Sequence, residues 1–439
     1  MGSWKDPRLL LSFALACMSP ACGGVVPGEL DDAAALLGAA AASAREARRE
    51  VIGTGDPALD VPAVQSAVAA GGEVTLVGTF DFGATGRVLI TRDVDIRGKD
   101  RAVVKGGFFT FYSPLPPLPV PAPGPAIGIR DLVFDGALRS PIHLAYARSV
   151  EIHGNHIRNV RPFVTPPNPA VPIPGFALQA GIMLGTYHDY RPAAVPGAFT
   201  GRVTVSGNHL DLTGTAPAQT LCQGVFLGRG WGVTVRVAGN TISGCSRNAI
   251  EILDNARGEA GEGRIDVVEN RIHAPAIGVP YPTPNRPNGI IIGWFFDPTG
   301  AIDPARNLPH RVAGNEIVCD GQFSTGIFAN SAGVSIRENA ISVAGTGAYG
   351  IALASPGGRL AENRIEGSGR AAIALLPFFP ALPQITPAGN RLACNDVSGF
   401  TSSVADLILG GNANVVRGFE GSILDQGAGN QVRPGGECE

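Results

Sequence analysis

Four consecutive residues, Tyr187-His188-Asp189-Tyr190, carry side chains that exchange protons readily. Arg229 lies further along the chain. Removing a proton beside a carboxylate requires a cation to neutralise that carboxylate, a base to take the proton and an acid to return one. Arg229, His188 and either Tyr187 or Tyr190 can fill these roles in that order. The residues therefore favour β-elimination or epimerisation of a uronate sugar.

Three acidic residues keep hydrolysis open as an alternative. Glu251 and Asp254 are neighbours in the sequence, and Asp189 lies upstream of them. A glycosidase needs two carboxylates, about 5–5.5 Å apart for retention or about 6.5–9.5 Å apart for inversion. We place elimination or epimerisation slightly ahead of this reaction.

A repeated phrase indicates the elements that must position these side chains. Gly or Glu, then Asn, any residue, and Ile or Leu recurs eight times, in most copies after a β-prone stretch. The asparagines are Asn155, Asn208, Asn240, Asn270, Asn315, Asn339, Asn363 and Asn390. The shortest interval between them is 24 residues. We expect each Asn to adopt the left-handed conformation of a turn and to bond to the next Asn along a stack.

A second phrase follows the asparagines, as in Gly181-Ile-Met-Leu184 and Gly350-Ile-Ala-Leu353. Two strands in every ~24 residues are the signature of a parallel β-helix. Each coil is too small to bury its own apolar face, so the coils must stack to form a continuous core. The pattern predicts an all-β fold, a single-stranded parallel β-helix.

The outward residue of the second phrase forms a predicted row across neighbouring coils. This row contains His143, Met183, Phe226, Glu251, Ile291, Phe328, Ala352 and Ala374. Such a row of aromatic and polar groups, repeated about every 4.8 Å, suits an elongated saccharide. The predicted substrate-binding residues are His143, Tyr146, Phe226, Trp231 and Trp294. The alternative is that these side chains pack beneath the Pro-rich insertions.

The N-terminal end of the stack requires a cap, because a terminal coil exposes unpaired strand edges. We expect Asp60 to cap a short helix that Gly71-Gly72 ends, with Glu73–Phe80 as the first strand. This run, D-x-x-A-V-Q-x-A-V-A-A-G-G-x-V-x-L-x-G-x-F, resembles the N-terminal cap and first coil of the pectin-lyase-like superfamily. The resemblance covers about residues 56–437 and implies a right-handed β-helix with an N-terminal capping helix.

The same resemblance leaves the reaction open, because the superfamily holds lyases, hydrolases, epimerases and proteins without known activity. The Asn-Thr-Asp and Gly-His-Gly motifs of polygalacturonases are absent from this sequence. Tyr187-His-Asp-Tyr190 resembles the Tyr/His/Asp groups of alginate epimerases and lyases, without their Asp-Pro-His motif. The sequence therefore predicts a protein that acts on or binds an extracellular polysaccharide, with a non-catalytic surface scaffold or binding protein as the alternative.

Composition limits the partners and cofactors. Charged residues make up 16% of the 439 residues, against about 25% in a typical domain, and the formal net charge is −3. We expect no nucleic-acid partner, since no Lys/Arg run appears. We expect no cofactor and no metal; calcium, which needs clustered acidic residues, has no support. A monomer is expected.

The N-terminus predicts export. Residues 1–22 contain a basic start, the apolar run Leu9–Ala16, and small residues before Cys17 and Cys22. Cys17 and Cys22 are candidates for lipidation, and Ala14-Leu15-Ala16 is the competing cleavage site. Residues 23–55 are predicted to be an Ala-rich linker and residues 56–439 the β-helix domain. The expected location is extracytoplasmic, either secreted or attached to the outer membrane of a Gram-negative bacterium through the lipid anchor alone.

Five cysteines follow this segment, and an oxidising compartment permits disulfides among them. Cys222 and Cys245 lie one coil apart, so a coil-to-coil bridge is predicted. Cys394 with Cys438 is the second candidate pair, which leaves Cys319 unpaired.

Overall fold

In the computed structural model the chain divides into two units, Met1–Glu46 and Ala47–Glu439. The structure describes residues 48–116, 123–164, 177–185, 199–213, 220–228, 230, 232–245, 247–253, 255, 257, 263–274, 288–293, 308–377, 386–433 and 435. The predicted signal peptide, both lipidation candidates and most of the predicted linker lie outside these residues. No helix among the described residues is long and apolar enough to cross a membrane.

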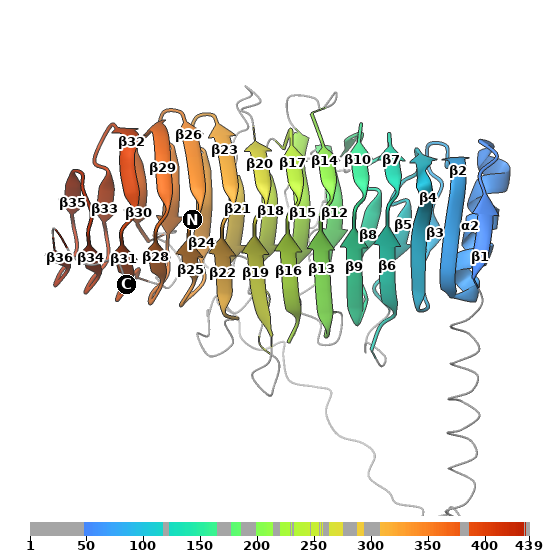
Figure 1. Ribbon diagram of the computed structural model, residues 1–439, viewed down its shortest axis with the longest axis horizontal. Helices are drawn as coiled ribbons and strands as arrows, with labels where there is room; N and C mark the ends of the chain where they lie inside the picture. Colours follow the sequence, from blue (N-terminus) through green and yellow to red (C-terminus); the bar gives the residue numbers. More distant parts are fainter. Residues whose placement is uncertain are drawn as a thin grey trace, which may run out of the picture. The chain divides into compact units, whose positions relative to one another are not determined.

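The described strands form two parallel sheets whose members pair from coil to coil (Figure 1). Sheet A holds 23 of them and sheet B holds 13, and one pair, β11 (Phe163–Val164) with β12, is antiparallel. Consecutive parallel strands joined through a crossover are almost always connected with a right-handed turn. The prediction of an all-β, right-handed parallel β-helix is confirmed.

Sheet A contributes two strands to most coils, one before and one after the asparagine corner. Its first strands are the short β1 (Arg49–Ile52) and the long β2 (Gly72–Asp81) and β4 (Val94–Lys105). The strands before the corner are β6 (Ala126–Arg130), β9 (Ser149–His153), β13 (Arg202–Ser206), β16 (Thr234–Ala238), β19 (Arg264–Val268), β22 (His310–Ala313), β25 (Ser335–Arg337), β28 (Arg359–Ala361) and β31 (Arg391–Ala393). The strands β34 (Val415–Arg417) and β36 (Gln431–Arg433) continue this series beyond the last corner. The strands after the corner are β7 (Val133–Asp135), β10 (His156–Arg158), β14 (His209–Asp211), β17 (Thr241–Ser243), β20 (Arg271–Ala274), β23 (Glu316–Asp320), β26 (Ala340–Ala344), β29 (Arg364–Gly369) and β32 (Asp396–Ser402).

Sheet B contributes the third strand of each coil and contains the second sequence phrase. Its parallel strands are β3 (Val88–Leu89), β5 (Phe111–Ser113), β8 (Ile142–Leu144), β12 (Ala177–Leu184), β15 (Thr220–Gly228), β18 (Asn248–Leu253), β21 (Asn288–Gly293), β24 (Thr325–Asn330), β27 (Tyr349–Leu353), β30 (Ala371–Leu375), β33 (Leu407–Leu409) and β35 (Ile423–Asp425). Most coils thus have three strands where the sequence predicted two, because the chain bends at Asn and continues as a short strand of sheet A. The inward residues of all three strands form one continuous core.

The N-terminal cap is the helix α2 (Pro57–Ala70), as predicted, but its first residues differ from the prediction. Asp56, not Asp60, is the N-cap, and its side chain accepts a hydrogen bond from the Ala58 amide. Asp60 lies one turn inside and is buried. Its carboxylate accepts from Thr54 N and Oγ1 and Gly55 N of the preceding turn, and from Asp81 N of the first coil. Asp60 therefore ties the cap to the stack.

Two further contacts close the N-terminal edges of the sheets. Strand β1 pairs with β2 at the end of sheet A, so the β-helix begins within the segment expected to be linker. The side chain of Gln65 accepts from Leu89 N at 2.7 Å and donates to Leu89 O at 3.1 Å. The Gln65 amide thereby makes the hydrogen bonds that a neighbouring strand would make at the edge of sheet B.

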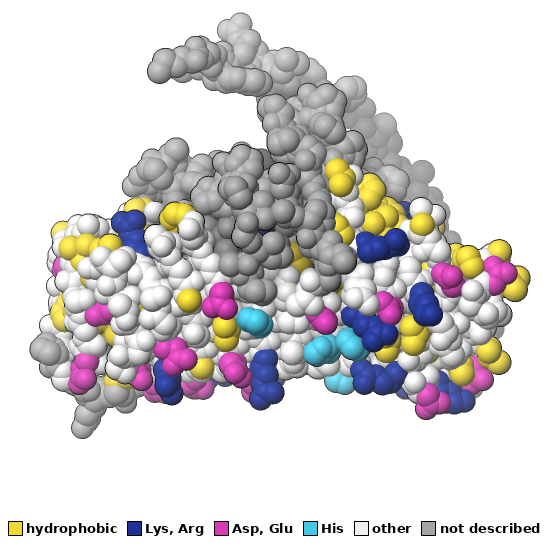
Figure 2. Space-filling model, turned by 90° about the horizontal axis from the view of Figure 1, so that it is seen from above, with side chains coloured by type: hydrophobic (Ala, Val, Ile, Leu, Met, Phe, Trp, Pro, Cys, Tyr) yellow, Lys and Arg dark blue, Asp and Glu magenta, His cyan; other side chains and the backbone are white. Residues whose placement is uncertain are grey.

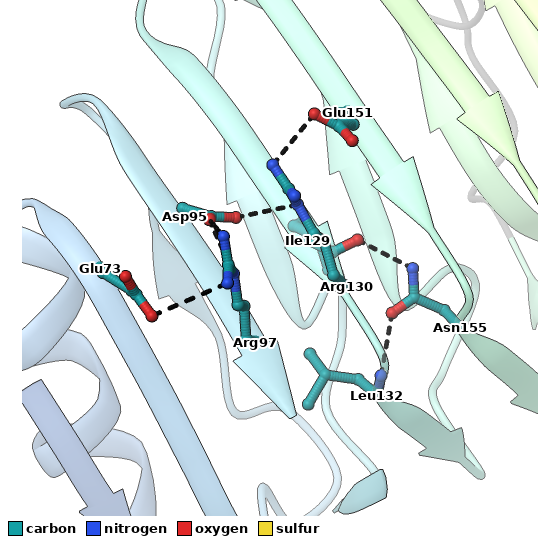
Figure 3. Close-up of polar contacts among 8 residues, drawn as sticks. All are labelled: Glu73, Asp95, Arg97, Ile129, Arg130, Leu132, Glu151 and Asn155. Atoms are coloured by element: carbon teal, nitrogen blue, oxygen red, sulfur yellow. Dashed lines mark hydrogen bonds and ion pairs between the residues drawn. The ribbon is translucent and has the colours of Figure 1, made fainter. Parts of the chain in front are cut away.

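The asparagine ladder forms as predicted for seven of its eight members. In each step, Asn Nδ2 and the Asn backbone N–H donate to Oδ1 of the next asparagine; between Asn208 and Asn240 both distances are 3.0 Å. The ladder runs through Asn155, Asn208, Asn240, Asn270, Asn315, Asn339, Asn363 and Asn395. At its start, Asn155 accepts from Leu132 N and donates to Ile129 O (Figure 3).

Asn390 is the exception. It lies before β31, not after it, and donates to Asn414, which in turn donates to Asn430. The last rung of the main ladder is Asn395, which follows Cys394 and therefore lacks the Gly or Glu of the repeated phrase. The sequence could not separate these two asparagines, since only four residues lie between them and one coil contains both.

The left-handed conformation belongs to the residue before each ladder Asn, which corrects the expectation that Asn itself adopts it. This preceding residue has a φ of +66° at Gly154, +62° at Gly207, +61° at Gly239, +58° at Glu269, +63° at Gly314, +56° at Glu338, +56° at Glu362 and +51° at Cys394. Asn thereby keeps its amide directed along the buried stack while the preceding residue makes the turn. Glycine adopts this conformation without strain and glutamate does not.

Replacing Glu362 by glycine is accordingly expected to raise the free energy of unfolding by about 0.5–1 kcal/mol, because relief of the left-handed strain exceeds the added freedom of the unfolded chain. Urea denaturation measures the change. Gly239→Ala is the matched opposite: an added Cβ there meets no atom within 4 Å, so its expected loss of about 1 kcal/mol reports on the backbone alone. A lower denaturation midpoint for Glu362→Gly would contradict this account.

Candidate functional site

The outward row of sheet B forms in the predicted order. Strand pairing sets Met183 opposite His143, Phe226 opposite Met183, and Glu251 opposite Phe226. The row continues through Ile291, Phe328, Ala352 and Ala374. Of these eight side chains only Ile291 is more than slightly exposed. The side chains of this row are therefore mostly buried and do not line an open groove.

Glu251 lies in the middle of this row and is held by amides from two coils. Its exposed fraction is 2%. Gln223 Nε2 and Asn248 Nδ2 both donate to Glu251 Oε2, the latter at 2.7 Å. Asn288 Nδ2 donates to Asn248 Oδ1 at 2.8 Å and extends the network to a third coil. These hydrogen bonds fix the orientation of the Glu251 carboxylate. It lies on the outer side of sheet B, outside the hydrophobic core.

A repeated position in the sequence indicates these three amides. Gln223, Asn248 and Asn288 each stand directly before the Gly or Ala of the second phrase. Strand pairing sets Gln223 opposite Asn248 and Asn248 opposite Asn288. Three amides at one repeat position beside a row with a single carboxylate indicate a polar site.

Apolar side chains flank Glu251 on sheet B, where Phe226 and Ile291 lie opposite it on the neighbouring strands. Met183, Phe226 and Leu253 pack together with Ala180 and Ile291. Phe226 is only 1% exposed, and its ring lies so close to Gly228 that an added Cβ would come within 2.6 Å of Cζ. In this structure Phe226 packs in the cluster and does not present a free face for a sugar ring.

A second cluster occupies the N-terminal end of the same row. The guanidinium carbon of Arg87 lies 4.9 Å from the ring centroid of Phe108, 5.4 Å from that of Phe109 and 4.9 Å from that of Tyr112. Arg87 Nε donates to Phe108 O at 3.0 Å. Partial burial lowers the pKa of Arg87, and cation–π contacts are worth about 0.5–2 kcal/mol, depending on how far they are desolvated. We call Arg87, Phe108, Phe109, Tyr112, Arg139 and His143 the aromatic–arginine cluster.

His143 is the inner member of this cluster. Its ring lies 4.3 Å from that of Phe109 and 5.2 Å from that of Tyr112, and Nε2 is 3.2 Å from Gly185 O. Contact with a carbonyl makes Nε2 the donor, so Nδ1 is an unprotonated acceptor; it is buried and has no hydrogen-bond partner. Burial, together with the charge of Arg139, lowers the pKa of His143 to about 3. The imidazole is therefore neutral at physiological pH.

Tyr146 lies just beyond β8 and is half-buried. Its carbonyl accepts a hydrogen bond of 2.6 Å from Ser113 Oγ. Burial raises the pKa of its phenol, so the hydroxyl keeps its proton at neutral pH. The remaining predicted site residues lie outside the described residues: Tyr187, His188, Asp189, Tyr190, Arg229, Trp231, Asp254 and Trp294.

Histidines also gather on the outer face of sheet A, beside Lys and Arg side chains (Figure 2). The rings of His156 and His209 are 4.7 Å apart, and burial with the neighbouring His209 lowers the pKa of His156. His153 contacts Ser206 Oγ at 3.1 Å, and His273 lies 3.8 Å from Asp320. Within the described part of the chain, no three His, Cys, Asp or Glu side chains are grouped to hold a metal ion.

The cysteines differ in part from the prediction. Cys222 and Cys245 are adjacent and buried, but both are free thiols with sulfurs 3.3 Å apart, so the predicted bridge is not formed. A disulfide requires about 2.05 Å. Cys319 is free and buried, as predicted for the unpaired member. Cys394 is disulfide-bonded, while its predicted partner Cys438 lies outside the described residues.

The proximity of the two sulfurs predicts a bridge on oxidation. Diamide treatment of the protein is expected to remove two hydrogens from Cys222 and Cys245 and to raise the free energy of unfolding by about 3 kcal/mol. Peptide mass spectrometry after alkylation in denaturant measures the bridge. Cys222→Ser is the control and gains no stability. If diamide leaves both thiols of the unchanged protein open to alkylation in denaturant, the prediction is wrong.

No protein-family model and no curated protein sequence matches the chain. Among solved structures it is similar to the A-module of the mannuronan C-5 epimerase AlgE6 of Azotobacter vinelandii, at 13% identity over 87% of this chain and 96% of that one, with a TM-score of 0.40. It is also similar to a mutant DFA-IIIase of Arthrobacter chlorophenolicus A6, at 11% identity over 88% and 98%, with a TM-score of 0.39. The Dettilon tailspike protein matches at 14% identity over 81% and 68%, with a TM-score of 0.34. The pairing of its own strands makes the chain a right-handed parallel β-helix protein.

Proposed function

We propose that the protein acts on an extracellular polysaccharide at the outer row of sheet B, with Glu251 as the central acid–base group. The observation that carries this proposal is the buried carboxylate of Glu251, oriented by Gln223 and Asn248 on a face that lies outside the core. A folding core gains nothing from a buried carboxylate, whereas catalysis gains from a fixed charge in a site with little water.

The neighbouring groups support an acidic sugar as substrate. Tyr112 and His143 lie on the same row as Glu251, and Arg87 covers the Tyr112 ring. No ion pair joins Arg87 to a carboxylate among the described residues, so its charge is available to a uronate carboxylate. Aromatic faces beside a cation suit a sugar ring that carries an acid.

Elimination or epimerisation fits this arrangement better than hydrolysis. From β3 to β33, Glu251 is the one carboxylate on the described strands of sheet B, and hydrolysis requires two. In the proposed reaction an arginine neutralises the uronate carboxylate, a base removes the C5 proton and an acid returns a proton. Arg229, His188 and Tyr187 or Tyr190 remain the proposed partners of Glu251, with Asp189 and Asp254 as the carboxylates that hydrolysis would need.

The test is to incubate the protein with polygalacturonate, alginate and a neutral glucan. Elimination produces an unsaturated sugar that absorbs in the ultraviolet, and epimerisation in heavy water places deuterium at C5, which NMR detects. We expect one of these signals from a uronate polymer and none from the glucan. Reducing ends without unsaturation would establish hydrolysis instead, and the absence of all three products would overturn the catalytic proposal.

A non-catalytic binding protein is the second candidate. The burial of Met183, Phe226 and Phe328 favours it, because a row that packs beneath other residues serves structure first. Under this alternative the protein binds the polymer without changing it. Binding in a pull-down with no product in the assay above is the result that would favour the scaffold.

We also propose that residues 1–22 direct export and that Cys17 or Cys22 receives a lipid. The apolar run before these cysteines supports the proposal. Mass spectrometry of the protein from membrane and medium fractions tests it: a diacylglyceryl mass on the N-terminal Cys supports anchoring, and an N-terminus directly after Ala16 without lipid supports secretion.

A further inference from the structure

Arginine side chains lie on the outer face of the last strands of sheet A, from β25 to β36, in two adjacent rows. They are Arg337 on β25, Arg359 on β28, Arg391 on β31, Arg417 on β34 and Arg433 on β36. Arg359 and Arg391 form one row, and Arg337, Arg417 and Arg433 lie in the other. Residues next to them in the strands, such as Leu360 and Leu392, are buried, so alternation turns the arginines outward. We call these five residues the arginine stripe.

The stripe places like charges directly opposite one another. Arg359 pairs with Arg391 across neighbouring strands, and Arg417 pairs with Arg433. Opposed like charges destabilise a sheet. Arg359, Arg391 and Arg417 are exposed and form no ion pair among the described residues, whereas Arg337 pairs with Glu338 at 3.1 Å. The stripe therefore carries positive charge that the fold itself does not neutralise.

In the first coils, arginines on the outer face of sheet A have acidic partners that neutralise their charge. Arg97 lies 3.9 Å from Glu73 and 2.8 Å from Asp95, and Arg130 lies 3.2 Å from Asp95 and 3.0 Å from Glu151 (Figure 3). There Arg97 lies opposite Arg130, and the acidic row two residues earlier on the strands, with Glu73, Asp95 and Glu151, supplies their partners. The repeat thus accommodates an acidic row beside the arginines, and neither outward row of β25, β28, β31, β34 and β36 contains an acidic residue. The arginines without an ion pair in these final coils therefore mark a site for an external anion.

We propose that the arginine stripe binds an anionic polysaccharide whose chain runs along the axis of the β-helix. Successive coils are separated by about 4.8 Å, close to the length of one sugar residue in an extended chain. Consecutive acidic sugars can therefore meet Arg359 and Arg391 in one row and Arg417 and Arg433 in the adjacent row. The planar guanidinium groups bind carboxylate or sulfate oxygens in pairs. Ala361 and Ala393, two residues after Arg359 and Arg391 on the same face, leave room for the chain.

This site goes beyond the proposed function, because it lies on sheet A and uses none of the sheet B residues. A remote site for the same class of polymer retains the chain between encounters with Glu251 and raises its local concentration. A polysaccharide also fits the stripe better than nucleic acid does. Duplex DNA presents one charge per about 1.7 Å, and the five strands that carry the stripe contain no aromatic side chain on which a base could stack.

The test compares polygalacturonate binding by the full chain and by the triple variant Arg359→Gln/Arg391→Gln/Arg417→Gln over a range of salt concentrations. We expect the triple variant to bind at least about 10-fold more weakly, and the salt slope to fall by about one per lost ionic contact. The control is Arg97→Gln/Arg130→Gln/Arg158→Gln, in which Arg158 pairs with Asp135 at 2.9 Å. It removes the same charge from paired arginines of the first coils and is expected to change binding less than about twofold. Urea denaturation verifies that both variants fold.

Several results would overturn the inference. Equal binding by the triple variant, equal loss in the control variant, or equal binding of neutral dextran would each remove the stripe as a specific site. Stronger binding of a single-stranded oligonucleotide than of polygalacturonate would assign it to nucleic acid instead. The triple variant must keep the turnover of the unchanged protein at saturating polymer, so that failure of the stripe and failure of the sheet B site give different results.

Discussion

Replacing Glu251 by glutamine is expected to lower turnover of a uronate polymer by about 10²–10⁴-fold, with little change in KM. Glutamine has nearly the same shape, and its carbonyl oxygen can still accept from Gln223 and Asn248. The substitution therefore removes the charge and the proton acceptor but leaves the packing of Met183 and Phe226. Initial rates of unsaturated product, measured over a range of polymer concentrations, give both constants.

The matched control is Glu366→Gln. Glu366 lies on β29 of sheet A, is exposed, and pairs with Arg364 at 3.4 Å. Exposed pairs of this kind contribute little, so turnover and stability should both stay near those of the unchanged protein. If Glu251→Gln keeps full turnover, Glu251 is not the acid–base group; if it unfolds the protein, its amide network is structural.

Replacing Asn240 by alanine is expected to lower the free energy of unfolding by about 3–5 kcal/mol. The side chain of Asn240 accepts from Asn208 N and Nδ2, and it donates to Val205 O at 2.9 Å and to Asn270 Oδ1 at 2.9 Å. All of these atoms are buried, and each orphaned donor or acceptor costs about 1–3 kcal/mol. The urea midpoint at an unchanged m-value measures the loss.

Two further variants test separately the hydrogen bonds that Asn240 donates and the effect of burial on a rung of the ladder. Asn240→Asp keeps the acceptor for Asn208 but cannot donate to Val205 or Asn270, and it buries a charge, so a loss of similar size is expected. Asn430, the last rung of the second ladder, is only partly buried, and water can replace its partners. Asn430→Ala should cost about 1–2 kcal/mol. Equal losses at Asn240 and Asn430 would mean that burial does not set the strength of a rung.

The row from His143 to Ala374 shows how much of the site the sequence could predict. Alternation within each phrase identified the outward residue, and stacking in register brought those residues together. The pattern could not indicate that this outer face is buried. Alternation separates the core side of a strand from the other side, but it does not reveal whether further residues cover that other side.

The ends of the repeat show a second limit. Asp56 and Asp60 are both acidic residues near the start of α2, and their different roles depend on the positions of Thr54 and Asp81. Asn390 and Asn395 likewise share one coil, and only the pairing of β28 with β31 determines which of them meets Asn363. A local sequence pattern cannot predict these hydrogen-bond partners, because they depend on contacts between residues far apart in the sequence.

The sequence by itself determined the coil, the ladder and the order of side chains along each row, because a repeat that buries apolar residues at fixed spacing can stack in one register only. The tertiary structure alone decided which polar groups meet. Gln223, Asn248 and Glu251 share a hydrogen-bond network, and Arg359 opposes Arg391, because coils widely separated in sequence lie on neighbouring strands. Spacing within one coil fixes the direction of a side chain, and contacts between coils fix its partner.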